Sequence, residues 1–374
     1  MNVRLTGTGD ESMVIGYIGL GLIGGSIAKT MRRVHPEYTQ IAYNRTNAVV
    51  GEAIRDGVID EGCFDISAAF SKCDYIFLCV PVMTMREYLK ELAPIIKEGA
   101  IITDVGSTKG DIHEMVHELG LDAHFIGGHP MAGSEKTGYA NATDRMIENA
   151  WYILTPGEDV EIHKVSEFSG LIGELGAMPL VISADEHDYV TAAISHVPHV
   201  ISASLVNMVH DIDSDAHYMH SIAAGGFKDI TRISSSSPQM WQEICLANSE
   251  NICAVLGSYI RKLTDFRFAI RNGDEKKLLE YFTACKDYRD SFSDRSVGPI
   301  RKQYRIYMDL ADEAGAIAEI AVILGNAGIS ISNIGIVHNR EFEQGVLRIE
   351  FYDEAAMKRA SEVLKGKNYK LYEA

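Results

Sequence analysis

Residues 14–33 read VIGYIGLGLIGGSIAKTMRR and contain the pattern G-x-G-x-x-G at Gly19, Gly21 and Gly24. An apolar stretch precedes these glycines, and an amphipathic stretch with basic residues at its end follows them. Glycines at such a turn let a pyrophosphate approach the N-terminus of a helix, where unpaired N–H groups favour an anion. The order of strand, glycine turn and helix therefore predicts the first βαβ unit of a dinucleotide-binding domain.

The following segments continue the same alternation. Short apolar runs recur with room for a helix between them, at residues 40–43, 74–80, 100–105, 124–127, 150–154 and 180–182. Several of these runs are rich in Ile and Val and apolar on both faces, which is typical of a parallel sheet covered on both sides. We therefore expect an α/β, doubly wound dinucleotide-binding domain over residues 13–183.

The remainder of the chain divides into two further parts. Helical patterns predict an all-helical domain over residues 184–291, with helices at 185–209, 215–224, 238–272 and 274–292. A segment rich in Ser, Gly and charge follows, and residues 303–374 then have the order β-α-β-β-α-β of a ferredoxin-like module. The helical domain is apolar enough to bury a face in a partner subunit, and the last module has the size of a small-ligand sensor.

The composition excludes several classes of protein. The chain has 374 residues, 46% of them hydrophobic and 23% charged, which is a globular mixture. Its net charge of −17 argues against nucleic acid and anionic membranes as partners. The apolar run at residues 13–28 has acidic residues before it and basic residues after it, the reverse of a signal peptide, and is too short to span a membrane. With six cysteines and no CxxC pair, we expect a cytoplasmic protein.

One short motif suggests a metal site. Residues 113–117 read HEMVH and match the zinc pattern H-E-x-x-H. The apolar positions of the same helix place His113 and His117 on its polar flank, and a catalytic zinc also needs a third ligand in an enclosed cavity. We therefore expect a solvated helix face at these residues and no metal.

The end of the second predicted strand bears on the choice of cofactor. It has Asn44, Arg45 and Thr46 where NAD-binding domains carry an acidic residue for the ribose 2′-hydroxyl. Arg45 could pair with the 2′-phosphate of NADP. Alternatively, Asn44 serves the ribose of NAD and Arg45 faces solvent. The sequence leaves both cofactors open and favours NADP.

Four further clusters combine glycines with polar residues. They are DVGSTKG at 104–110, GGHPMAGSEKTG at 127–138, SHVPH at 195–199 and GGFKDITR at 225–232. The first two follow predicted strands, where ligands bind in doubly wound sheets. In this order, and together with GLGLIGGS at 19–26, they resemble the prephenate dehydrogenase family of tyrosine biosynthesis. DEAG at 312–315 and NAGISI at 326–331 resemble an ACT domain.

The resemblance implies oxidative decarboxylation of prephenate to 4-hydroxyphenylpyruvate and CO2, with hydride transfer to NAD(P). It implies three catalytic residues, namely His129 as the base, Ser107 between nicotinamide and substrate, and Asp188 as the acid that orients the histidine. An imidazole with a pKa of about 6.5 suits proton transfer near pH 7, and the residues around His129 predict that it is exposed at a strand end. Ser107 could also, or instead, cap a helix that starts at Lys109, and Asp188 could be an exposed helix charge.

The resemblance also implies binding residues. Arg232 is the candidate clamp for a substrate carboxylate, because a guanidinium binds carboxylates through two hydrogen bonds. The other candidates for substrate binding are His199, His196, which could also be a histidine packed between helices, Gly225 and Trp241. The cofactor set is Gly19, Gly21, Leu22, Ile23, Gly24, Asn44, Arg45, Thr46, Val80, Pro81 and Ser107. The positions expected to bind L-tyrosine as a feedback effector are Asp312, Gly315, Asn326 and Gly328.

Three other functions stay open at this level. Arogenate, with an amine in place of the keto group of prephenate, is an alternative substrate. Another β-hydroxyacid dehydrogenase would need a catalytic lysine, for which Lys228 is the candidate near the motifs. A non-catalytic ACT sensor is disfavoured by His129, Ser107 and Arg232. Asn44 and Ser234 depart from the residues common in the family. The resemblance further implies a homodimer formed through the helical domain.

Overall fold

The computed structural model describes residues 12–66, 69–133, 136–294, 304–309, 313, 315–337, 346–367 and 369–372. Asp312, one of the positions expected to bind an effector, lies outside the described residues. The chain divides into two compact units, Met1–Lys286 and Asp287–Ala374. Each unit is described by itself.

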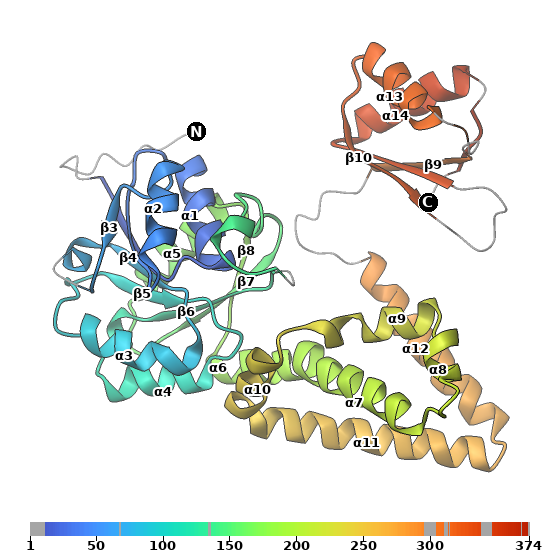
Figure 1. The fold of residues 1–374 in the computed structure, drawn as a ribbon, viewed down its shortest axis with the longest axis horizontal. Coiled ribbons are helices and arrows are strands. Elements are labelled where there is room, and N and C mark those ends of the chain that lie inside the picture. The colour runs from blue at the N-terminus through green and yellow to red at the C-terminus, as the bar shows by residue number, and fades with distance from the viewer. Residues whose placement is uncertain are drawn as a thin grey trace. The chain divides into compact units, whose positions relative to one another are not determined.

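The first unit begins with a five-stranded parallel sheet (Figure 1). Its strands are β1 (Val14–Ile18), β2 (Thr39–Tyr43), β3 (Glu61–Cys63), β4 (Tyr75–Leu78) and β5 (Ile101–Asp104). They lie in the order β3-β2-β1-β4-β5, and every neighbouring pair is parallel. The short strand β3 was not predicted, because its residues Glu-Gly-Cys lack an apolar pattern.

Both faces of this sheet are buried, as the sequence predicts. Tyr75 and Phe77 of β4 belong to one hydrophobic cluster, while the alternating Ile76 and Leu78 belong to another. The helices that connect the strands are α1 (Leu22–Val34), α2 (Asn47–Arg55), α3 (Val82–Leu92) and α4 (Gly110–Glu118). The alternation of strand residues between two cores confirms a doubly wound α/β architecture.

A second, three-stranded sheet follows and corrects the expectation of parallel strands throughout. It contains β6 (Ile126–Pro130), β7 (Trp151–Pro156) and β8 (Met178–Val181), with α5 (Ile162–Glu174) between β7 and β8. Strand β6 pairs with β7 in antiparallel orientation, and β7 pairs with β8 in parallel. A parallel bridge between Ile102 and Phe125 places the start of β6 beside β5.

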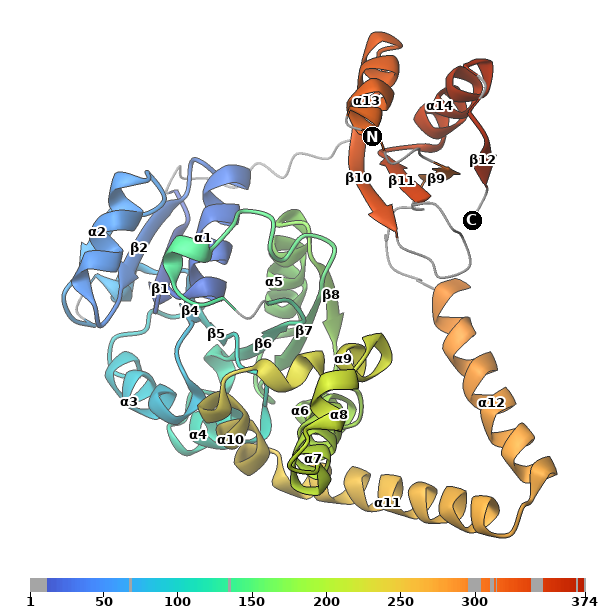
Figure 2. The same ribbon diagram turned by 45° about the vertical axis from the view of Figure 1, so that its right-hand side comes forward.

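The helical part starts directly after β8. It consists of α6 (Ala184–Thr191), a π-helical turn (Ala192–His196), α7 (Val197–Ile212), α8 (Tyr218–Ile222), α9 (Gly225–Thr231), a 3-10 turn (Arg232–Ser235), α10 (Pro238–Ala247), α11 (Ser249–Arg271) and α12 (Glu275–Asp294). Val197 of α7 and Ile252 of α11 share a small core where these helices meet (Figure 2). The single helix predicted over 238–272 is wrong, because Asn248 interrupts it between α10 and α11.

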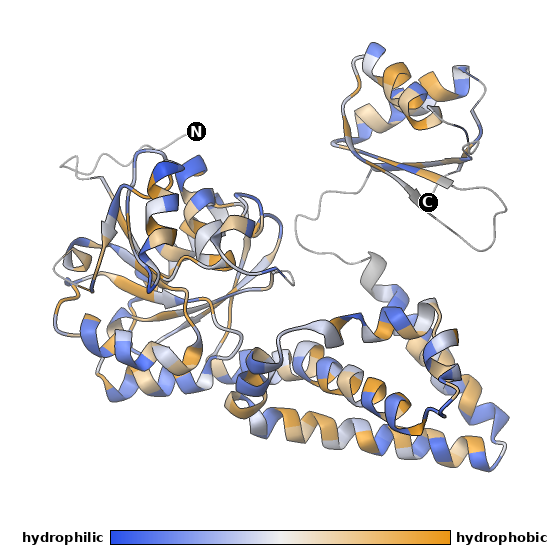
Figure 3. Ribbon diagram, viewed as in Figure 1, coloured by the Kyte–Doolittle hydropathy of each residue, from blue (hydrophilic) through white to orange (hydrophobic). Residues whose placement is uncertain are grey.

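Much of the helical part exposes apolar side chains, and Figure 3 shows hydrophobic residues recurring along α7 and α11. Ile212, Ile222, Leu246, Phe268 and Leu279 are each more than half exposed. Residues 184–212 form one described helical stretch that is long and apolar enough to cross a membrane by length and composition. A single such stretch is weak evidence for a membrane span, and its first turns contain buried polar side chains.

The second unit has the expected order of elements. These are β9 (Tyr304–Asp309), α13 (Ala316–Asn326), β10 (Ile331–Val337), β11 (Val346–Phe351), α14 (Glu354–Gly366) and β12 (Leu371–Tyr372). The strands lie in the order β10-β11-β9-β12 and pair in antiparallel orientation. A separate core formed by α13, α14 and the sheet, with Ile320, Leu347 and Leu364 fully buried, makes this part self-contained.

Candidate active site

The glycine loop between β1 and α1 has the geometry of a dinucleotide site. Gly19 has a φ of +98°, which L side chains rarely adopt. A Cβ at Gly24 would lie 2.3 Å from the carbonyl oxygen of Gly19, so helix and loop pack too closely for a side chain. A Cβ at Gly21, by contrast, would meet no atom within 4 Å. Gly21 caps α1 without a side-chain hydrogen bond, so the helix N-terminus can accept a pyrophosphate.

Asn44 at the end of β2 supports this loop. Its Oδ1 accepts a hydrogen bond from the Leu20 backbone N–H at 3.0 Å, and its Nδ2 donates to the Thr46 carbonyl oxygen. Arg45 is exposed next to it. Asn44 therefore joins β2 to the glycine loop, a structural role that the sequence did not suggest.

His129 lies on β6 and is only 9% exposed, which corrects the prediction of an exposed histidine. Burial, followed by electrostatic interactions with Lys109, His187 and His196, holds the pKa of His129 well below its usual value of 6.5. The imidazole is therefore neutral at pH 7. A neutral, buried imidazole has the protonation state that a general base requires.

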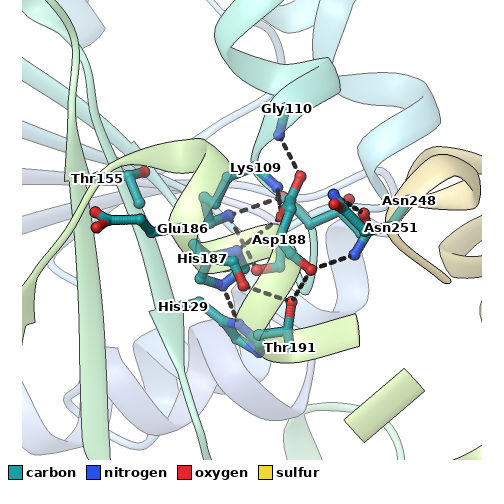
Figure 4. Close-up of polar contacts among 12 residues, drawn as sticks. Lys109, Gly110, His129, Thr155, Glu186, His187, Asp188, Thr191, Asn248 and Asn251 are labelled. Atoms are coloured by element: carbon teal, nitrogen blue, oxygen red, sulfur yellow. Dashed lines mark hydrogen bonds and ion pairs between the residues drawn. The ribbon is translucent and has the colours of Figure 1, made fainter. Parts of the chain in front are cut away.

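The partner of His129 is His187, which the sequence analysis did not select. His129 Nδ1 lies 2.8 Å from His187 Nε2, and His187 Nδ1 lies 2.8 Å from Asp188 Oδ1 (Figure 4). His187 is fully buried, and Asp188 is 4% exposed. Asp188 is therefore neither an exposed helix charge nor a direct partner of His129, because His187 lies between them.

The Asp188 carboxylate also caps α4. Its Oδ1 accepts from the backbone N–H of Lys109 and its Oδ2 from that of Gly110, both at 2.8 Å. Although burial alone would raise it, the pKa of Asp188 is lowered by hydrogen bonds from His187, Gly110 and Lys109. The predicted cap by Ser107 is wrong, because α4 begins at Gly110 and a carboxylate from α6 satisfies its first N–H groups.

A buried ion pair lies beneath the same loop. Lys109 Nζ contacts Asp104 Oδ2 at 2.5 Å, and both side chains are fully buried. Lys109 Nζ also donates to the Gly106 and Thr108 carbonyl oxygens, while Asp104 accepts from the Gly106 and Gly128 backbone N–H groups. The pair thus joins the end of β5 to the residue before His129. Asp104 and Lys109 both belong to the DVGSTKG segment at 104–110, but the sequence of that segment does not indicate that the two side chains form an ion pair.

His196 is held by an asparagine for which the sequence offered no signal. Asn248 Nδ2 donates to the Asp188 carbonyl oxygen at 2.7 Å and lies 3.2 Å from His196 Nδ1. Asn251 Nδ2 donates to Asn248 Oδ1, which fixes the orientation of the Asn248 amide. His196 Nδ1 therefore accepts, and its buried Nε2 carries a hydrogen without a partner among the described residues.

The other candidates for substrate binding lie on the helical side. The rings of His199 and Trp241 stack with centroids 3.6 Å apart, and His199 Nδ1 donates to the Ser195 carbonyl oxygen. Burial and then the charge of Arg232 lower the pKa of His199, which places Arg232 near that ring. A Cβ at Gly225, the first residue of α9, would meet no atom within 4 Å. The structure therefore stacks His199 on Trp241, within the electrostatic influence of Arg232, and leaves Gly225 in open space.

Two other features are separate from this network. A pocket of about 540 Å³ in the helical part contains none of the predicted site residues; it is lined by Val206, Val209, His210, Asp213, His217, Met219, His220, Ala223 and Phe227. His117 is exposed as expected, but His113 is half-buried against Phe125, with its Nε2 2.9 Å from Thr155 Oγ1. Among the described residues, no group of three or more His, Cys, Asp or Glu could hold a metal ion.

A glycine loop at the N-terminus of α1 and a buried neutral histidine together define a dinucleotide-dependent oxidoreductase. Family profiles agree: residues 27–180 match "Prephenate dehydrogenase, nucleotide-binding domain" and residues 183–284 match "Prephenate dehydrogenase, dimerization domain". The chain belongs to the prephenate dehydrogenase family, an NAD(P)-dependent group of enzymes.

Individual relatives support this assignment. Prephenate dehydrogenase of Bacillus subtilis is 39% identical over 93% of this chain and 95% of its own length. Cyclohexadienyl dehydrogenase of Zymomonas mobilis is 33% identical over 74% of this chain and 94% of its own length. A crystal structure of prephenate dehydrogenase from A. aeolicus with hydroxyphenyl propionate and NAD+ matches with a TM-score of 0.71 and 31% identity, covering 75% of this chain and 99% of that chain.

The glycine loop generates a first prediction. Gly24→Ala should reduce the free energy of unfolding by about 1–3 kcal/mol, because the added methyl group collides with backbone. The matched variant Gly21→Ala should leave the melting temperature unchanged and weaken NAD(P) binding, because its methyl group occupies open space in the loop. Thermal unfolding and cofactor titration measure the two effects. Equal melting temperatures for the two variants would contradict this account of the loop.

The buried ion pair generates a second prediction. Lys109→Met should cost about 3–5 kcal/mol of stability, because Asp104 is left buried without a compensating charge. Lys97→Met is the matched control: its pair with Asp74 measures 2.7 Å but is partly exposed on both sides, so the cost should be about 0–1 kcal/mol. Urea unfolding measures the loss of stability in each variant. Similar losses for Lys109→Met and Lys97→Met would contradict the distinction between the buried and the exposed ion pair.

Proposed function

We propose that this chain catalyses the oxidative decarboxylation of prephenate to 4-hydroxyphenylpyruvate and CO2 in L-tyrosine biosynthesis. The observation that carries the proposal is the buried, neutral His129, which a hydrogen-bond chain holds next to the polar loop after β5. Membership in the family and the name of the Bacillus subtilis relative support the choice of substrate.

In the proposed reaction His129 accepts the proton of the C4 hydroxyl group while hydride leaves C4. NAD(P)+ supplies the hydride acceptor. Loss of the ring carboxylate as CO2 then makes the ring aromatic, and the proton returns to the phenol oxygen. His129 has a pKa low enough to be unprotonated at neutral pH. Ser107, in the loop between β5 and α4, is proposed to contact nicotinamide and substrate.

Arg232, His199, His196 and Trp241 are proposed to bind the substrate. Prephenate carries two carboxylates, and the protein has a net charge of −17, so a local cation must hold the anion against the overall field. Arg232 supplies that cation near His199. Among the residues that the structure describes, the buried donors His196 Nε2 and Trp241 Nε1 have no hydrogen-bond partner, which fits a ligand that offers several oxygen acceptors.

The cofactor is proposed to lie over Gly19, Gly21 and Gly24 at the N-terminus of α1, within reach of Val80 and Pro81 at the end of β4. Asn44 already accepts a hydrogen bond from Leu20. The exposed Arg45, with Thr46 beside it, therefore favours a cofactor that carries a 2′-phosphate. We propose a preference for NADP, although the A. aeolicus structure contains NAD+.

The assembly and compartment are also proposals. We propose a homodimer formed by the helical part, because its exposed apolar side chains resemble a core divided between two subunits. The family profile matched by residues 183–284 is described as a dimerization domain. We place the protein in the cytoplasm, where thiols stay reduced, because all six cysteines, each in a described segment, are unpaired.

The second unit is proposed to be an ACT domain of residues 303–374 that binds L-tyrosine as an inhibitor. The order of elements and the loops around Gly315, Asn326 and Gly328 support this proposal. The extent of the matches also supports a separate role for this unit. The A. aeolicus chain matches over 99% of its own length but over only 75% of this chain, whereas the match to the Bacillus subtilis relative covers 93% of this chain. The solved A. aeolicus chain thus has no counterpart for about a quarter of this chain.

The proposed activity is tested by absorbance at 340 nm with prephenate or arogenate, each with NAD or NADP. We expect rapid turnover of prephenate and a preference for NADP. Because burial holds the pKa of His129 well below 6.5, kcat/KM should stay level through pH 6.5 and fall only at lower pH, where His129 becomes protonated. His129→Asn should abolish turnover and leave substrate binding measurable.

Arg232→Gln should mainly raise KM, because a carboxylate clamp acts in ground and transition states alike.

Two outcomes would contradict these assignments. A normal kcat in His129→Asn would refute the base. Turnover of arogenate alone would keep the type of reaction and replace prephenate as the substrate. Arogenate is the alternative to test because the similar proteins include a cyclohexadienyl dehydrogenase and an arogenate dehydrogenase.

Regulation is tested by removing residues 300–374. We expect L-tyrosine to inhibit the full chain, and the truncated chain to retain activity but lose inhibition, because the second unit has its own core. Initial rates with increasing tyrosine measure both. Unchanged sensitivity of the truncated chain would place the effector site in the first unit.

A further inference from the structure

Two buried side chains, His187 and Asp188, lie behind the proposed base. Among the described residues, neither side chain is hydrogen-bonded to a residue predicted to bind the substrate. Figure 4 shows the three residues in a row, with His187 between His129 and Asp188. We propose that His187 is a positioning residue that fixes the tautomer of His129 and so makes Nε2 the proton-accepting atom. This proposal rests on the proposed role of His129 as a base.

The first step follows from the carboxylate. Asp188 is ionised at neutral pH, and an ionised carboxylate only accepts hydrogen bonds. Its Oδ1 lies 2.8 Å from His187 Nδ1. His187 Nδ1 must therefore carry a hydrogen and donate it. The backbone N–H groups of Lys109 and Gly110 hold the carboxylate in place, so this acceptor has a fixed position.

The second step passes through His187. Burial, outweighing the opposing effect of the Asp188 hydrogen bond, keeps the pKa of His187 below its usual value, and the nearby Lys109 ammonium acts in the same direction. The imidazole is therefore neutral, with its one hydrogen on Nδ1. Its Nε2 then has a lone pair, which faces His129 Nδ1 at 2.8 Å.

The third step assigns the proton on His129. Two lone pairs cannot face each other at 2.8 Å in a hydrogen bond, so His129 Nδ1 carries the hydrogen and donates it to His187 Nε2. Because His129 is also neutral, its Nε2 has the lone pair. The tautomer of a histidine is set by the hydrogen bond that its other nitrogen makes. Here a second histidine, oriented by a carboxylate, makes that bond.

The arrangement also has a consequence after proton transfer. When His129 Nε2 accepts the substrate proton, the ring becomes a cation in a buried site close to Lys109. The hydrogen bond from Nδ1 to His187, which itself donates to Asp188, then points toward a negative charge. His187 thus orients the neutral base and connects the protonated base to the carboxylate, with every proton staying on a nitrogen.

A pair of substitutions separates tautomer control from simple packing. His187→Leu removes the acceptor that faces His129 Nδ1, whereas His187→Gln can present an amide oxygen there. We expect His187→Leu to lower kcat by about 10²–10³-fold, the scale of general-base catalysis, with KM changed by less than about threefold. His187→Gln should recover at least about tenfold of that loss. His163→Leu, at an exposed histidine paired with Glu161, is the control and should match the unsubstituted enzyme.

A spectroscopic measurement tests the same inference without turnover. In the full chain labelled with ¹⁵N-histidine, the two ring nitrogens of His129 are identified by their loss in His129→Asn. We expect a protonated Nδ1 and an unprotonated Nε2 near pH 7.5, and the opposite or a mixed tautomer in His187→Leu. This readout stays valid if prephenate is not the substrate, so failure of the proposed function and failure of this inference are distinguishable.

Three results would overturn the proposal. One is a protonated Nε2 on His129 in the unsubstituted protein. Another is a kcat in His187→Leu within about threefold of the unsubstituted enzyme. The last is an equal loss of kcat in His187→Leu and His187→Gln with KM raised in both, which would show that His187 only packs the site. If His187→Leu does not fold, the Gln variant and the spectrum of the unsubstituted chain still decide.

Discussion

The Asp188 carboxylate at the N-terminus of α4 is the interaction on which the site depends. It is buried, yet it stays ionised because two backbone N–H groups and His187 donate to it. A helix N-terminus stabilises an anion through its unpaired donors and its dipole. The same carboxylate orients His187, and His187 contacts His129. One carboxylate thus caps a helix of the α/β part and orders the side chains from which the chemistry is proposed to come.

This interaction also explains how two architectures share one site. Asp188 belongs to α6, the first helix after the α/β part, while α4, β5 and β6 belong to the sheet-containing part. The Lys109–Asp104 pair beneath the loop uses the same few residues, so the ends of β5 and β6 are tied to one another and to α6. Strong buried contacts hold the base. On the helical side His196 and Trp241, which are proposed to bind the substrate, have buried donors without a partner among the described residues. A base held rigidly by buried contacts, together with donors such as His196 Nε2 and Trp241 Nε1, suits a site that binds an anion.

Particular residues show how far sequence reasoning extends. Gly19, Gly21 and Gly24 specified the nucleotide loop, because a glycine pattern between strand and helix has few other uses. His129 was selected but expected to be exposed, since its glycine and proline neighbours suggested an accessible strand end. They lie instead on β6, with Lys109, Asp104 and His187 packed around the histidine. Asn248 carried no local signal at all, because its role is to bond Asp188 and His196 from a distant helix.

The sequence by itself determined the α/β class, the helical part, the order of elements in the second unit and the family. These properties follow from local periodicity and from short motifs, which neighbouring residues define. Only the tertiary structure decided which histidine contacts the base, which residue caps α4, and that β6 pairs in antiparallel orientation with β7. The first two features depend on contacts between residues 58 and 78 positions apart, and the third joins strand residues 22–30 positions apart. Their cause is the burial of polar groups, which must find partners wherever the fold brings them together.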